Sequence, residues 1–126
     1  MTFKSFLKEL DDRQIFSLER SLDTLFSRLN VDVEFSNHFK ERLKGRESEI
    51  KFDEIKEAFR KLFLKYRDGI IQDPELQGLL KDIFTYLNIP FGVHKKADGS
   101  YELRTITIMK KRNFVPNNSI DKVFTV

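Results

Sequence analysis

The chain has 126 residues, 40% hydrophobic and 34% charged, with a formal net charge of +3, which fits one domain with a modest core and excludes a disordered chain. It contains no cysteine and only two histidines, which excludes a disulfide scaffold, a zinc–thiolate site and a thiol nucleophile and disfavours a multi-histidine metal site. No stretch approaches the ~20 apolar residues of a membrane span, and residues 1–8 lack the continuous apolar run of a secretory signal. We therefore expect a cytosolic protein with no membrane association.

The first half of the chain predicts three helices and one short strand. Apolar residues recur at three- and four-residue steps before Asn30, which is typical of an amphipathic helix. The next five residues alternate apolar and acidic side chains, as a strand does. Ser36 or Asn37 can cap a second helix, and Asp53 and Glu54 favour the start of a third. The predicted elements are helices over residues 12–29, 37–46 and 53–67 and a strand over residues 31–35.

The second half begins as a helix and then changes character. Asp73 and Pro74 form a cap and a first-turn proline, and the apolar residues after them keep a 3.6-residue period as far as Asn88. Residues typical of strands then prevail, and Asp98-Gly99 indicates a hairpin turn. Helices followed by an antiparallel sheet predict an α+β fold. The predicted elements are a helix over residues 73–88, strands over 89–94, 101–109 and 123–126, and a loop over 116–119.

Positive charge is concentrated in two segments. Residues 36–51 carry a net charge of +2 and residues 89–126 a net charge of +4, whereas the other two parts of the chain are net negative. If the two segments meet in space, they form one basic face that can bind a polyanion by releasing its counterions. The alternative is a solvated surface with no ligand.

The segment 36–47 holds the most informative spacing. His38, Arg42 and Arg46 are four residues apart, so on a helix each is displaced by about 40° from the one before, and together they form a cationic stripe about 12 Å long. Histidine changes charge near neutral pH, and arginine offers a fork of donors to phosphate oxygens. The stripe therefore suits a phosphodiester, and an exposed polar helix face is the alternative.

Two apolar residues beside the stripe can anchor this helix. Phe39 and Leu43 follow His38 and Arg42 by one residue each. We predict that the helix at 37–46 packs beside the hairpin at 89–111, with Phe39 and Leu43 buried and Arg42 at least partly exposed.

The stretch from Phe35 to Glu47 contains H-x-x-x-R-x-x-x-R-E ahead of a helical pair and a hairpin, and it resembles the RelE/RegB-type ribonucleases of the barnase, EndoU, colicin and RelE-like group. The resemblance implies a RelE-like arrangement in which a ribose 2′-hydroxyl attacks the adjacent phosphate with no metal or cofactor. The catalytic residues that it implies are His38 as acid or base, Arg42 and Arg46 as phosphate ligands, and Lys110, or else Lys111 or Arg112, as the group that stabilises developing charge. Sites of the RegB type use a second histidine, and the sequence does not place His94 in that role.

RNA or another nucleic acid is the partner that this resemblance implies. Most of the thirteen phenylalanines fall on apolar helix faces and belong to the core, but Phe114 follows a basic run and is a candidate for base stacking. The predicted nucleic-acid-binding residues are Lys40, Lys44, Lys95, Lys96, Arg104, Lys111, Arg112 and Phe114.

The wider chain, over about residues 31–126, resembles a family of small proteins from large contractile-tailed marine bacteriophages. The matching stretches are 33–39 with Arg42, 79–82, 88–91 and 105–114. Residues 1–9 also resemble the N-terminal targeting peptides of phage head internal proteins, because Leu7-Lys8-Glu9 matches their L-x-E cleavage site. We therefore expect a single domain over 12–126, preceded by a targeting peptide or tail at 1–11.

Two functions follow as predictions. The first is a phage-encoded, metal-independent endoribonuclease, or an inactive relative that binds RNA, in the host cytoplasm. The alternative is a non-enzymatic virion component, packaged in the head or associated with the neck or tail, whose basic face contacts DNA or other phage structural proteins.

Overall fold

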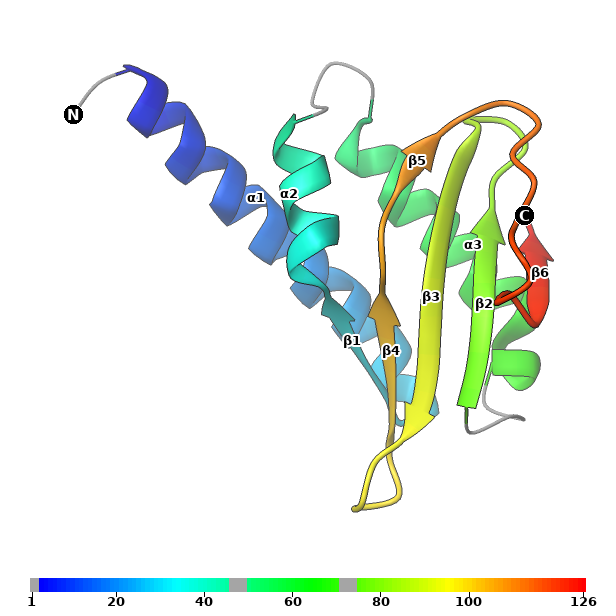
Figure 1. The fold of residues 1–126 in the computed structure, drawn as a ribbon. Helices are drawn as coiled ribbons and strands as arrows, with labels where there is room; N and C mark the ends of the chain where they lie inside the picture. The colour runs from blue at the N-terminus through cyan, green and yellow to red at the C-terminus, as the bar shows by residue number, and fades with distance from the viewer. Residues whose placement is uncertain (1–2, 46–49, 71–74) are drawn as a thin grey trace.

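A computed structural model describes residues 3–45, 50–70 and 75–126 (Figure 1). These residues form three α-helices, one 3-10 helix and a sheet, and all strands except the first follow the helices, which confirms the α+β class. The helices are α1 (Phe3–Phe26), a short 3-10 helix (Ser27–Leu29), α2 (Asn37–Gly45) and α3 (Phe52–Ile70). The strands are β1 (Val31–Phe35), β2 (Glu75–Lys81), β3 (Leu87–Lys95), β4 (Tyr101–Thr105), β5 (Met109–Lys110) and β6 (Lys122–Thr125).

The sheet is mixed, so the expectation of a purely antiparallel sheet is wrong. Its strand order is β1-β4-β3-β2-β6, and β5 pairs with the end of β3. The two outer pairs, β1 with β4 and β2 with β6, are parallel, whereas β3 is antiparallel to each of its partners. Parallel neighbours need a long connection between them. For β1 and β4 this connection consists of α2, α3, β2 and β3.

Helices α1 and α3 lie behind the sheet in Figure 1 and bury one of its faces. Along β1, Val31, Val33 and Phe35 are buried and the two acids between them are exposed, so alternate residues point to the core and to solvent. Phe26 at the end of α1 is fully buried, and its ring meets Phe59 and Phe63 of α3 edge to face, with centroids 6.2 and 5.6 Å apart. These rings join the two helices. The opposite face of the sheet is partly open.

The helix expected over residues 73–88 is instead strand β2, a turn and the start of β3. Leu79 and Leu80 are both buried although they point to opposite faces of the sheet, because β2 lies inside the sheet and is covered on both sides. A strand buried on both faces loses the alternation that marks a strand in sequence. Gly78 fits this packing, since a Cβ there would lie 2.6 Å from Cζ of Phe91. The expected cap at 73–74 lies outside the described residues.

Helix α1 begins at Phe3, so residues 3–11, which lie in the segment expected as a targeting peptide or tail, are helical and continue into the helix predicted from residue 12. Two of its acids bind the free edge of β1. The N–H of Val33 donates to Asp23 Oδ1 at 2.9 Å, and the N–H of Phe35 donates to Glu19 Oε2 at 2.6 Å. Carboxylates that occupy edge N–H groups keep another strand from pairing there.

The strand expected over residues 101–109 is interrupted between Thr105 and Met109. Strand β1 ends beside Thr105, where Phe35 is its last paired residue, and α2 takes the place of β1 beyond this point. Side chains at the start and middle of α2 then bind carbonyl oxygens of the interrupted stretch. The turn signal at Asp98-Gly99 is confirmed, because Gly99 adopts a positive φ of 91° between β3 and β4.

Candidate nucleic-acid interface

Helix α2 is fixed at its start by Ser36. The Ser36 hydroxyl accepts the N–H of Phe39 at 3.1 Å, as a helix cap does, and donates to the carbonyl of Ile106 at 2.8 Å. Phe39 and Leu43 are buried at 0% and 1% exposure. The predicted anchoring of this helix is therefore confirmed, and α2 lies beside the segment that joins β4 to β5 (Figure 1).

Arg42 is half-buried against that segment. Its Nε donates to the carbonyl oxygen of Ile108 at 2.7 Å. Arg42 remains partly exposed, as predicted. His38 is exposed and lies one helical turn before Arg42, on the same side of α2. Within the described residues, neither the imidazole of His38 nor the two Nη atoms of Arg42 have a hydrogen-bond partner. Arg46, the third residue of the predicted stripe, lies outside the described residues.

The other side of the same segment borders a shallow hollow on the open face of the sheet. Arg104 and Ile106 line it together with His94 of β3, and its volume is about 270 Å³. Arg104 faces Gly92 across β3 and β4, so a small residue leaves room beside the guanidinium. The structure thus places His94 near Arg104, and α2 contributes no residue to this hollow.

Lys110, predicted to be catalytic, is engaged by α3. Its Nζ lies 3.2 and 3.3 Å from the two carboxylate oxygens of Glu54, and both side chains are largely shielded from solvent. Lys111 and Arg112, the next two residues, are exposed. The alternatives to Lys110 that the sequence left open therefore present their charges to solvent, whereas Lys110 balances an acid.

Three further predicted binding residues lie among carboxylates. Lys44 pairs with Asp12 at 2.7 Å, and Lys96 pairs with Asp32. The hydrogen bond with Asp32 raises the pKa of Lys96. Lys40 and Lys96 both line a hollow at the β1 edge that holds five acids against three basic residues. These lysines therefore belong to a neutralised or acidic part of the surface, which does not attract a phosphate chain.

The remaining predicted residues have two kinds of surroundings. Lys95 is exposed at the end of β3, next to the hairpin loop. Phe114 is half-buried, and its carbonyl accepts from Nζ of Lys81 at 3.5 Å. Its ring is therefore less available for stacking than a fully exposed aromatic side chain.

One set of predicted residues lies on or beside the segment that joins β4 to the loop after β5. We call this set the basic edge: His38 and Arg42 of α2, and Arg104, Lys111 and Arg112. The pairing of Arg42 with Ile108 joins its two parts. An acid–base group and several cations along one exposed edge suit a phosphodiester backbone.

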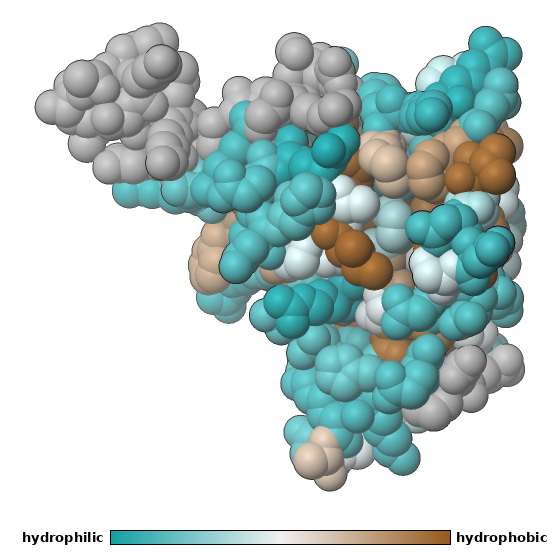
Figure 2. Space-filling view, viewed as in Figure 1, coloured by the Kyte–Doolittle hydropathy of each residue, from teal (hydrophilic) through white to brown (hydrophobic). Residues whose placement is uncertain are grey.

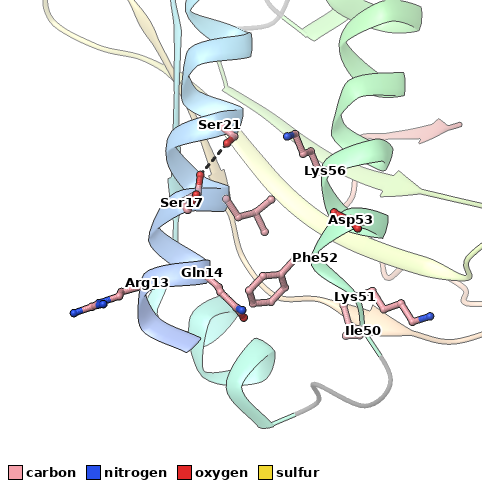
Figure 3. A pocket seen from close by; sticks show the side chains of 10 residues that line it. Arg13, Gln14, Ser17, Ser21, Ile50, Lys51, Phe52, Asp53 and Lys56 are labelled. Atoms are coloured by element: carbon pink, nitrogen blue, oxygen red, sulfur yellow. Dashed lines mark hydrogen bonds between the residues drawn. The ribbon is translucent and has the colours of Figure 1, made fainter. Parts of the chain in front are cut away.

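A larger hollow than that on the sheet lies elsewhere, in a groove of about 650 Å³ between α1 and the start of α3 (Figure 3). Leu18 and Ile50 are buried beneath it and Phe52 is half-buried. Arg13 and Lys51 point away from each other in Figure 3. The cations at this groove do not converge on one point, and the sequence carried no signal for it.

No family model, no curated protein and no solved structure matches the chain. Within residues 3–45, 50–70 and 75–126, no group of three or more histidine, aspartate or glutamate side chains could hold a metal ion. No helix in this described part is both long and apolar enough to cross a membrane.

Proposed function

We propose that this protein binds single-stranded RNA along the basic edge and cleaves it there without a metal ion. One observation carries the proposal: the hydrogen bond from Arg42 to the carbonyl of Ile108 at 2.7 Å. It holds the His38 side of α2 against the segment that bears Arg104, Lys111 and Arg112. The resemblance of residues 35–47 to RelE/RegB-type ribonucleases points to the same helix.

The chemistry follows from the residue types. The ribose 2′-oxygen attacks the adjacent phosphorus and loses its proton, while the bond from phosphorus to the 5′-oxygen breaks and that oxygen takes up a proton. The products are a 2′,3′-cyclic phosphate and a free 5′-hydroxyl. His38 takes part in proton transfer, because imidazole titrates near neutral pH. The Nη donors of Arg42 stabilise the charge that develops on the phosphate oxygens.

Charges that the structure leaves exposed complete the site. Lys111 and Arg112 replace Lys110 in our assignment, because Lys110 balances Glu54. Arg104 extends the edge toward the sheet hollow that also holds His94. A chain of phosphates lying along this edge would meet cations on both sides of Ile108.

The proposal is tested with two oligonucleotides of one sequence, one of ribose and one of deoxyribose, incubated with the protein in EDTA. We expect cleavage of the ribose strand alone, with 2′,3′-cyclic phosphate ends identified by mass spectrometry, because the 2′-hydroxyl is the nucleophile. Cleavage that requires a divalent metal, or equal cleavage of the deoxyribose strand, would contradict the mechanism. Tight binding without cleavage would leave RNA binding as the function.

A further inference from the structure

The turn between β2 and β3 exposes large apolar side chains at the end of the sheet. Ile83, Phe84 and Tyr86 are 52%, 78% and 43% exposed. Figure 2 shows hydrophobic surface at the end of the molecule where this turn and the segment after β5 lie, beside hydrophilic surface. A contiguous group of exposed apolar side chains often marks a surface that binds a ligand or partner.

The turn is held in one conformation by buried polar groups. Asp82 is 1% exposed, and its Oδ1 accepts the N–H groups of Phe84 and Thr85 at 2.9 and 3.2 Å. Its other oxygen pairs with Lys61 of α3 at 3.1 Å. Tyr86 is fixed with a φ of 63°, a left-handed conformation that non-glycine residues seldom adopt. The exposed rings therefore project from a rigid base rather than from a loose loop.

The turn is directly joined to the basic edge. The N–H of Lys111 donates to the carbonyl of Tyr86 at 2.9 Å, and Nδ2 of the buried Asn88 donates to the carbonyls of both Tyr86 and Lys111 at 3.0 and 2.9 Å. Lys111 is the third residue after Ile108, the contact of Arg42, which is about 10 Å of extended chain. A ligand on the basic edge could therefore reach the rings of the turn.

Each exposed ring also has a cation above it. Lys61 Nζ lies 5.3 Å from the centre of the Phe84 ring, and the guanidinium carbon of Arg112 lies 5.8 Å from the centre of the Tyr86 ring. Lys81, Lys111 and Arg112 add positive charge around the turn, and the acids beside it are Asp82, which pairs with Lys61, and Glu57, which interacts electrostatically with both of them. Aromatic rings interleaved with cations are typical of surfaces that bind single-stranded nucleic acid.

We infer that Phe84 and Tyr86 form a base-stacking subsite, on which unpaired bases of the RNA rest while its phosphates run along Lys111 and Arg112. This inference rests on the proposed function and says where the unpaired bases of the single-stranded RNA bind, because paired bases cannot lie flat on a protein ring. The competing occupant of this apolar surface is a protein partner. A protein partner would not account for the cations around the rings.

The test is the affinity of Phe84→Ala for a labelled single-stranded RNA whose 2′-oxygens are methylated to prevent cleavage, measured by fluorescence anisotropy. We expect a loss of about tenfold or more, since base stacking on one ring contributes this much to affinity. Tyr86→Asn, which tolerates the left-handed backbone, gives a second variant. Phe16→Ala is the matched control, because Phe16 is 58% exposed on α1 with Arg20 5.8 Å above its ring, and its affinity should equal that of the wild type.

Each outcome has a distinct meaning. Unchanged affinity of Phe84→Ala and Tyr86→Asn, in a protein that still cleaves RNA, would overturn the subsite and leave the proposed function standing. If the wild type neither binds nor cleaves single-stranded RNA, the proposed function fails and the subsite with it. If Phe84→Ala instead converts a self-associated wild type into a monomer without changing RNA affinity, the turn is a protein contact and the subsite is overturned.

Discussion

His38→Ala should lower the rate of RNA cleavage by about 10²- to 10⁴-fold, the range that a positioned acid or base contributes. Its affinity for RNA should stay within about twofold of the wild type, because the arginines and lysines of the basic edge supply most of the attraction to phosphate. The substitution should not disturb folding, since His38 is exposed. Single-turnover cleavage and anisotropy on the same preparations separate the two effects.

His94→Ala is the control for this experiment. His94 is also exposed, but it lies in the sheet hollow, to which α2 contributes no residue. We expect the cleavage rate of His94→Ala to lie within about tenfold of the wild-type rate and well above that of His38→Ala. Equal rates for His38→Ala and the wild type would show that His38 has no part in the chemistry.

Phe26→Ala should reduce the free energy of unfolding by about 3–5 kcal/mol, as truncation of a buried phenylalanine does. Phe26 is completely buried, and its ring contacts two aromatic residues of α3, so alanine leaves a cavity between α1 and α3. Because small domains are stable by only about 5–15 kcal/mol, such a loss would be visible as a large shift of the urea midpoint.

Phe16→Ala gives the comparison on the same helix. Phe16 is 58% exposed, so its truncation should change stability by no more than about 0.5 kcal/mol. A destabilisation of Phe26→Ala no larger than that of Phe16→Ala would mean that α1 is not docked on α3 as described.

The sequence predicted the first half of the fold well, for identifiable reasons. Helix α2 has a side-chain cap in Ser36 and two core anchors in Phe39 and Leu43, and all three have these roles in the structure. The strand at 31–35 alternates because one of its faces is buried and the other is open. Local pattern suffices where an element has one buried side.

The second half was harder because tertiary contacts decide it. Leu79 and Leu80 are buried on opposite faces of β2, and this double burial cannot be read from periodicity alone. The turn after β2 depends on Asp82, whose backbone contacts are local but whose partner Lys61 is 21 residues away in the chain. A helical period in the sequence was therefore misleading.

The geometry of the candidate site was predicted in part. The spacing of His38 and Arg42 indicated a shared helix side, but Glu54, which binds Lys110, comes from another helix 56 residues earlier. Asp12 and Asp32, which neutralise Lys44 and Lys96, are likewise distant in sequence. Counting basic residues by segment gives the charge of a stretch, but only the fold determines which charges remain unbalanced.

The location of the RNA on the surface tests the central claim most directly. At 15.0 kDa the chain suits amide chemical-shift mapping by NMR during titration with a methylated, uncleavable single-stranded RNA at low salt. We predict the largest chemical-shift changes in residues 36–42, 82–86 and 104–112. All of these changes should become smaller as the salt concentration rises, because salt screens the phosphate contacts. Shifts confined to the groove between α1 and α3, or no shifts at low salt, would contradict the assignment of the basic edge as a nucleic-acid site.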